Sequence, residues 1–413
     1  MKYRSVSYLS GEVRFHYKQG VFFRRKTFIP YEFIHSIVIS NNIFPRIFGA
    51  KHLQVNSATS ILRKSAINLW VSQKEKTGFS NIPLTVIYKG SFKRILLMAT
   101  TWSNSLSGLI ILAPIIQKVG NILGKKYEEQ LYHTFDISTY IAMVGIPPLM
   151  AFIAGFIIVG YAVSFTVILF RYGLFEAFSG EKNENFVVIN RGILNKNTFI
   201  TKTMRINAIE IRQSILMRLL HISSVYINTI GTGIIKGDKS LLIAAESDTV
   251  INDTLRKFKL QPDYFQNKIK LPKRAWMSYL SLPLYFLIGA ATLLVLLIFF
   301  GFFSPVVRLV FILAFPIIII WVIFRLEAAK QSALSLSDNA VKICYFHKLN
   351  LTKTIIPIQK IQFCSVKQNI FQKIAHTCNV QFYVYSAKRT SFIIKNLDYK
   401  KTIELVKSVE KAY

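Results

Sequence analysis

One pattern of apolar and polar positions recurs three times along the chain. The two clearest copies begin at Ile206 and Ile361, and each continues with alternating apolar residues, a polar pair and a short apolar run that contains a basic residue. A third copy begins at Ile34. Because repetition at a fixed internal register is the signature of duplicated units, the pattern predicts three copies of one small module.

Short runs of alternating apolar and polar residues surround each copy, as in antiparallel strands. Gly20 and Gly192 lie at matched positions, 172 residues apart, where a hairpin turn favours glycine, and the third copy has His347 there. Helices are expected at about 248–258 and 398–411. Each module is therefore predicted to be a small antiparallel β-barrel or sandwich with a C-terminal helix.

Two long apolar runs, roughly 279–300 and 305–324, flank a break at residues 301–305. Each approaches the ~20 residues that a helix needs to cross the ~30 Å hydrocarbon core of a bilayer. Basic residues precede and follow the pair, which places both ends on the cytoplasmic side by the positive-inside rule. These runs predict a transmembrane hairpin.

An earlier apolar stretch, about 137–171, is long for one helix and short for two. A single span would separate residues 1–136, with 19 basic and 6 acidic side chains, from residues 171–275, with 17 and 9. Because the positive-inside rule opposes that arrangement, we expect a second hairpin whose outer turn lies near Ala151–Phe156. Residues 106–117 are a rival partner helix, interpreted as an amphipathic helix lying in the membrane interface.

These signals predict an α+β membrane protein in which transmembrane helical hairpins separate three modules. The predicted segments are a divergent first module at 1–105, an interfacial linker at 106–136, a hairpin at 137–171, a second module at 172–275, a hairpin at 276–325 and a third module at 326–413.

Composition supports this division and offers little catalytic chemistry. The chain has 413 residues, is 52% hydrophobic and carries 52 basic against 20 acidic side chains. Its three cysteines all fall in the last copy, and its seven histidines lack metal-ligand spacing. We expect no catalytic site, no cofactor and no metal ion. Membrane tethering accounts for the basic charge, so no nucleic-acid partner is expected.

The repeated residues resemble those of the bacterial pleckstrin-homology-like, membrane-flanked domain family, particularly its multi-copy integral membrane members. The resemblance rests on Arg205-Ile206 with residues 213–220, and on residues 357–362 with 368–370. The first copy departs from it, with Phe33 where the others have Arg205 and Lys360. The resemblance implies a PH-like fold and a multi-pass protein of the bacterial cell membrane, and the charge pattern places the modules and both termini in the cytoplasm.

Basic residues at matched positions are the candidate binding residues. Anionic leaflets attract such side chains by roughly 1 kcal/mol each, so a surface that faces lipid headgroups or a protein partner is one interpretation. A solvated strand face is the other. The candidates are Arg205, Arg212 and Arg218, their counterparts Lys360, Lys367 and Lys373 at an offset of 155, and Arg24, Arg25 and Lys26 in the first module.

The predicted function is that of a non-enzymatic membrane scaffold or adaptor. Its cytoplasmic modules would bind anionic phospholipid headgroups or a membrane-protein partner, in envelope maintenance or stress resistance. The alternative is an accessory subunit of a membrane transporter or channel. That alternative needs polar residues inside the spans, and the apolar runs contain few of them.

Overall fold

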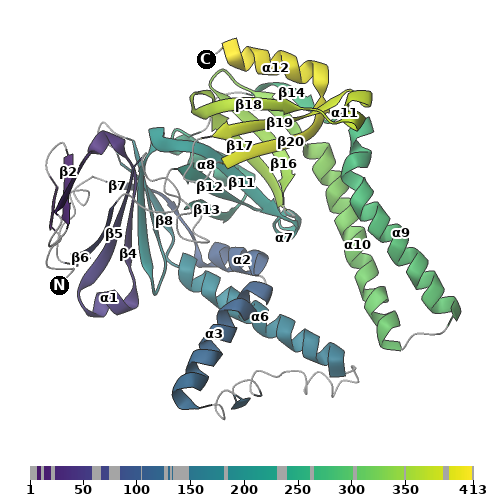
Figure 1. Ribbon diagram of the computed structural model, residues 1–413, viewed down its shortest axis with the longest axis horizontal. Coiled ribbons are helices and arrows are strands. Elements are labelled where there is room, and N and C mark those ends of the chain that lie inside the picture. The colour runs from purple at the N-terminus through teal and green to yellow at the C-terminus, as the bar shows by residue number, and fades with distance from the viewer. Residues whose placement is uncertain are drawn as a thin grey trace.

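The structure is a computed structural model of mixed α+β architecture (Figure 1). The expected hairpin turn at Gly20 and the apolar residues 137–147 lie outside the residues that it describes. The described residues are 7–10, 14–19, 24–57, 67–73, 84–103, 105–124, 129–130, 133, 148–180, 185–229, 240–260, 265–300, 305–347, 350–384 and 390–411.

Three modules follow one order of elements: three strands, a 3-10 turn, a fourth strand, a one-turn helix and two further strands. The first module comprises β1 (Ser7–Ser10), β2 (Arg14–Gln19), β3 (Arg25–Pro30), η2 (Tyr31–Phe33), β4 (Ile34–Asn41), α1 (Ile43–Ile47), β5 (Ala50–Ser57) and β6 (Ile67–Ser72). The second comprises β8 (Glu176–Gly180), β9 (Phe186–Arg191), β10 (Lys196–Lys202), η3 (Thr203–Arg205), β11 (Ile206–Ser214), α7 (Ile215–Leu219), β12 (Ser223–Thr229), β13 (Ser240–Glu246) and α8 (Asp248–Lys257). The third comprises β15 (Ala333–Leu336), β16 (Ala340–His347), β17 (Asn350–Pro357), η5 (Ile358–Lys360), β18 (Ile361–Lys367), α11 (Ile370–Ile374), β19 (Thr377–Val384), β20 (Thr390–Asp398) and α12 (Tyr399–Lys411).

Backbone conformation repeats with the same offsets as the sequence. Gly49, His221 and His376 are separated by 172 and 155 residues, and their φ angles are 65°, 52° and 49°. Each residue follows the one-turn helix of its module and leads into the next strand. The left-handed region favours glycine, and the two histidines tolerate it better than β-branched residues would. The helices expected at 248–258 and 398–411 are α8 and α12, which confirms them.

Neighbouring modules share their sheets, which the expectation of separate barrels or sandwiches did not include. The described strands form two seven-stranded antiparallel sheets with the orders β6-β5-β4-β10-β9-β8-β7 and β13-β12-β11-β17-β16-β15-β14, where β7 is Leu84–Lys89 and β14 is Gln266–Lys270. Each sheet joins the second half of one module to the first half of the next. Two three-stranded sheets, β1-β2-β3 and β18-β19-β20, lie at opposite ends of the molecule (Figure 1).

The strand pairs at the two module boundaries have equivalent registers. At the first boundary Ile37 of β4 lies opposite Ile200 of β10, and at the second Ile209 of β11 lies opposite Ile355 of β17. The offsets convert the first pair into the second, since 37 plus 172 is 209 and 200 plus 155 is 355. All four side chains are buried in the hydrophobic core. Burying an Ile side chain stabilises the folded chain by about 1.5–3 kcal/mol. The module boundaries therefore contribute to the stability of the fold.

The expected turn near Ala151–Phe156 is wrong, because residues 148–172 form the continuous helix α6 (Pro148–Tyr172). Its partner is α3 (Ser105–Leu123), the segment interpreted as interfacial, which follows α2 (Phe92–Trp102). The helices approach closely at Gly108 and Gly160, where a Cβ on Gly108 would lie 1.7 Å from the Gly160 carbonyl oxygen. Small residues at a crossing allow such backbone contact, which is typical of membrane helix pairs.

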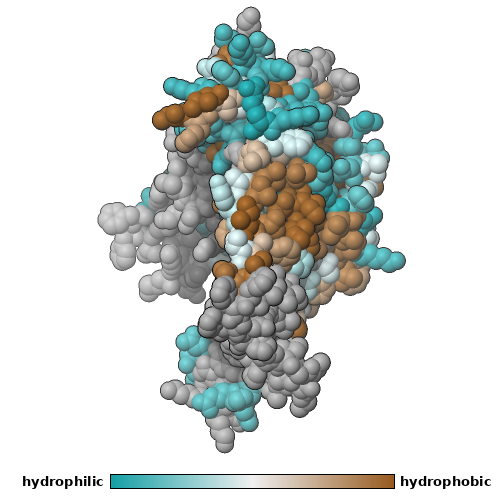
Figure 2. All heavy atoms as spheres, turned by 90° about the vertical axis from the view of Figure 1, so that its right-hand side faces the viewer, coloured by the Kyte–Doolittle hydropathy of each residue, from teal (hydrophilic) through white to brown (hydrophobic). Residues whose placement is uncertain are grey.

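Residues 154–172 form one helix long and apolar enough to cross a membrane, and the bent pair α2–α3 would supply a second span if it acts as one. The later apolar runs form α9 (Trp276–Phe300) and α10 (Pro305–Gln331), which pack against each other after the short turn η4 (Lys273–Ala275). Figure 2 shows an apolar belt over the described parts of this pair. Side chains more than half exposed there are Met277, Leu282, Tyr285, Phe286, Ile288, Ile320 and Ile323.

Candidate functional site

Three one-turn helices, α1, α7 and α11, connect the same two strands of each module. Local hydrogen bonds hold two of them in the same way. Gln213 Nε2 donates to the Ile222 carbonyl at 3.1 Å, and Gln368 Nε2 donates to the Thr377 carbonyl at 2.7 Å, with donor and acceptor both 155 residues later in the chain. Ser214 accepts a hydrogen bond from the Met217 amide as an N-cap. The backbone of these connections is therefore fixed.

Large apolar side chains project from all three helices. Two positions of the repeat are more than half exposed in every module, and we call the two exposed side chains of each helix its apolar tip. The side chains at the first position are Phe44 (78%), Leu216 (53%) and Phe371 (80%), and those at the second are Ile47 (73%), Leu219 (73%) and Ile374 (75%). Single exposed apolar residues are ordinary, but the same exposure at matched positions of three modules points to a surface that is covered by something apolar.

Each helix also carries one basic residue at a matched position: Arg46, Arg218 or Lys373. Lys373 is exposed, whereas Arg218 Nη2 lies 2.9 Å from Glu327 Oε2 on α10. Arg218 and Lys373 were among the predicted binding residues, and the structure places them beside the apolar tips. Arg46 was missed, although the offset of 172 from Arg218 would have identified it.

The apolar tips and the long helices lie on one side of the molecule. In Figure 1, α1, α7 and α11 follow the side of the β-sheets from which α3, α6, α9 and α10 project. The C-terminal helix α12 lies on the other side of the third module (Figure 1). A single bilayer that holds the long helices would therefore run close to the three tips.

Two other predicted residues, Arg205 and Lys360, end the turns η3 and η5 at the module junctions. Arg205 donates to the backbone oxygen of Glu32, and both basic side chains are partly buried. Burial lowers the pKa of Lys360, and the charge of Arg205 lowers it further. His35 of the first module lies in the same positive surroundings, so this cluster joins all three modules. Arg205 and Lys360 thus lie away from the tips on their own modules.

The remaining predicted residues are dispersed. Arg212 Nε donates to Glu210 Oε2 at 2.8 Å, and its guanidinium lies 4.9 Å from the centre of the Tyr226 ring. Lys367 is exposed at the end of β18. Arg24 and Lys26 are exposed at the start of the first module's third strand, which includes Arg25. The described side chains among the nine predicted residues are therefore not gathered into one site.

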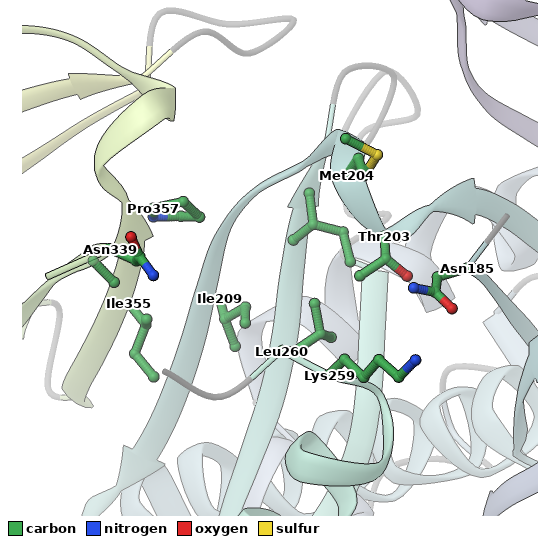
Figure 3. A pocket seen from close by; sticks show the side chains of 11 residues that line it. Asn185, Thr203, Met204, Ile209, Lys259, Leu260, Asn339, Ile355 and Pro357 are labelled. Carbon is green, nitrogen blue, oxygen red and sulfur yellow. The ribbon is translucent and has the colours of Figure 1, made fainter. Parts of the chain in front are cut away.

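A mostly apolar pocket of about 360 Å³ lies where the second and third modules meet (Figure 3). Its rim repeats one contact: the Thr203 amide donates to the Asn185 carbonyl at 2.7 Å, and the Ile358 amide donates to the Asn339 carbonyl at 3.0 Å. Lys259 supplies one charge. Within the described ranges, no three His, Cys, Asp or Glu side chains are placed to hold a metal ion.

A polar network joins β7 and α2, which precede the first helix pair, to β13 of the second module. Tyr88 Oη on β7 donates to the Ala244 carbonyl at 3.0 Å and to Glu246 Oε1 at 3.2 Å. Arg94 of α2 places Nε 3.2 Å from Glu246 Oε2. Burial raises the pKa of Glu246, while Arg94 and Tyr88 partly offset that rise. The network connects β7 and α2 to β13.

Comparisons with known proteins agree with the fold. A family model for the bacterial PH domain matches residues 1–80 and 131–252. UPF0699 transmembrane protein YdbT of Bacillus subtilis (strain 168) is 24% identical over 412 aligned positions, which cover 90% of this chain and 78% of that protein. No solved structure matches the chain significantly. These matches bear out the expected resemblance of the chain to bacterial PH-domain proteins.

Proposed function

We propose that the chain is a membrane-anchored scaffold whose three modules rest on the inner leaflet of the bacterial cell membrane through their apolar tips. The observation that carries this proposal is the exposure of six large apolar side chains at two matched positions of three modules. Leaving apolar area in water costs roughly 25 cal/mol per Å², and immersion in the interface would recover part of that energy.

The composition of the tips supports a lipid surface as the contact. Each tip combines apolar side chains with Arg46, Arg218 or Lys373, and that combination is typical of elements that lie in the interface of an anionic bilayer. The helix pairs α3–α6 and α9–α10 would act as the anchors. Similarity to a protein named as transmembrane supports this location. The proposed role is binding, with no chemical step, in envelope maintenance or stress resistance.

Hydrogen exchange on the full chain in lipid nanodiscs tests the proposal. Amides of α1, α7 and α11 should exchange more slowly in nanodiscs than in detergent micelles, and most slowly when phosphatidylglycerol is present. Exchange in α12, on the other side of the third module, should be the same in every environment. Equal exchange of the tips in nanodiscs and in micelles would overturn the proposal.

Matched variants separate the apolar and the charged contributions. Phe371→Ser combined with Ile374→Ser should abolish the added protection of α11 and leave α1 protected. Lys373→Gln should remove only the response to phosphatidylglycerol. Ile393→Ser on β20, a partly exposed site away from the tip, is the control and should change neither. If Ile393→Ser reduced protection as much as the tip variant, general instability would explain the effect.

A further inference from the structure

The two end sheets of the molecule have complementary edges. Among the described strands, β3 forms one edge of the sheet β1-β2-β3, and β18 forms one edge of the sheet β18-β19-β20. The counterparts of β3 are β10 and β17, and the counterparts of β18 are β4 and β11. Those counterparts pair with each other inside the chain, as β4 with β10 and β11 with β17. Each chain therefore has a strand equivalent to one side of an internal boundary at each end, β3 at one end and β18 at the other.

Side-chain exposure identifies the same two halves. The central pair of each internal boundary is Ile37 with Ile200 or Ile209 with Ile355, and these side chains are 1–6% exposed. By the repeat offsets, Cys364 on β18 is the counterpart of Ile37 and Ile209, and Phe28 on β3 is the counterpart of Ile200 and Ile355. Phe28 is 55% exposed, and Cys364 is partly exposed. At the neighbouring position Phe363 is 45% exposed, whereas its counterparts Ser36 and Ala208 are buried.

We propose that β18 of one chain pairs with β3 of a second copy, in the register of the internal boundaries. Because one chain carries both strands of this contact, in its two end sheets, we assign the partner strand to a second copy of the chain. The expected antiparallel pairs are Phe363 with Ile29, Cys364 with Phe28, Ser365 with Thr27, Val366 with Lys26, Lys367 with Arg25, and Gln368 with Arg24 of the second copy.

The proposed pairing would leave the long helices of both copies in the same membrane. Both internal boundaries leave the apolar tips on the side from which the long helices project (Figure 1). A third boundary of the same geometry would place the next copy's long helices on that side as well. Because the contact joins unlike surfaces, it is heterologous and extends into a row or closes into a ring.

One feature opposes the association. Lys367 would lie opposite Arg25, and like charges facing each other across strands are unfavourable. Lys26 and Arg24 add further positive charge to the edge of β3. Basic residues at strand edges limit uncontrolled pairing. We therefore expect the contact to be reversible and to depend on the high local concentration of chains in the membrane.

Disulfide trapping tests the register in the full chain in its native membrane. Phe28→Cys, at an exposed position that leaves the core intact, should form an oxidant-dependent disulfide with Cys364 of a neighbouring chain and give dimers and longer ladders. Thr27→Cys, one residue out of register, is the matched control and should give at most a tenth of the dimer. Adding Cys364→Ser to Phe28→Cys should abolish the ladder.

The remaining outcomes of the trapping experiment contradict the proposal. A disulfide within one chain, a product with a different protein, or equal dimer yields from Phe28→Cys and Thr27→Cys would each overturn pairing between copies. The result is independent of the proposed lipid contact, because the hydrogen-exchange experiment on the tips reports that contact separately.

A charge reversal supplies a second measurement in the Phe28→Cys background. Lys367→Glu should increase the rate of dimer trapping severalfold, because a glutamate would then face Arg25. Adding Arg25→Glu should restore like charges and return the rate to near its original value. A rate that responds equally to Lys367→Glu and to Lys395→Glu, a charge reversal on β20, would contradict the proposed register.

Discussion

Ile209 lies opposite Ile355 across the boundary between the second and third modules. Both side chains belong to the hydrophobic core that contains most of the second module's buried residues. The modules are therefore joined by paired backbone and shared core. A scaffold built in this way would hold its three tips at fixed relative positions, which independently tumbling domains would not do.

Removing this contact should destabilise the chain across the module boundary. Ile209→Ala and Ile355→Ala should each lower the free energy of unfolding by about 2–5 kcal/mol, as large-to-small substitutions do in cores. Because the side chains share one core, the double variant should lose less than the sum, by about 0.5–3 kcal/mol. Denaturant unfolding of the full chain in micelles measures the cycle. Strict additivity would show that the boundary pair is not coupled.

The crossing of α3 and α6 should be intolerant of any side chain at Gly108. A Cβ there would lie 1.7 Å from the Gly160 carbonyl oxygen, so Gly108→Ala must separate the helices, at a cost of roughly 1–3 kcal/mol or more. Gly289→Ala is the matched control on α9, where nothing lies within 4 Å of the added Cβ. Thermal unfolding in micelles should show a lower Tm for the first variant alone. Equal Tm values would contradict the crossing.

Stability should depend on pH through His35. Burial lowers the pKa of His35, the hydrogen bond to the Phe33 carbonyl opposes that shift, and Arg205 and Lys360 lower the pKa further. The folded chain therefore binds this proton less tightly than the unfolded chain, whose histidine has a pKa of about 6.5. The stabilising contribution is complete above that value and is lost as the pH falls through the folded-state pKa.

His35→Asn removes this titration and introduces the residue found at the same position of the second module, Asn207. The free energy of unfolding, measured from pH 8 to pH 5, should fall more steeply for the wild-type chain than for the variant. His133→Asn, the same substitution at an exposed position, is the control for replacing a histidine by asparagine. Parallel curves for wild type and His35→Asn would remove His35 as the cause.

Much of the modular organisation could be predicted from the sequence, because matched residues at two constant offsets report duplication directly. The offsets also identified Arg218 and Lys373, which flank the tips. The exposure of Leu216 and Phe371 could not be predicted, since an apolar residue in a repeat has the same pattern whether it is buried or exposed. Only its position on a one-turn helix at the end of two strands reveals the exposure.

Contacts between modules could not be predicted from the sequence. The pairing of β4 with β10 joins residues more than 150 positions apart, and no local periodicity specifies a partner at that separation. Residues 106–117 were predicted to form an interfacial helix, whereas the close approach of Gly108 and Gly160 depends on α3 and α6 together.

In the proposed arrangement all three tips contact lipid at once. Reconstitution of the wild-type chain with a phospholipid carrying a photoreactive group near its headgroup, followed by illumination and peptide mass spectrometry, measures this directly. Lipid adducts are expected on peptides containing Phe44, Leu216 and Phe371, in addition to those on the long helices, and none on α12. Adducts confined to the long helices, with the three tips unmodified, would contradict the proposed arrangement.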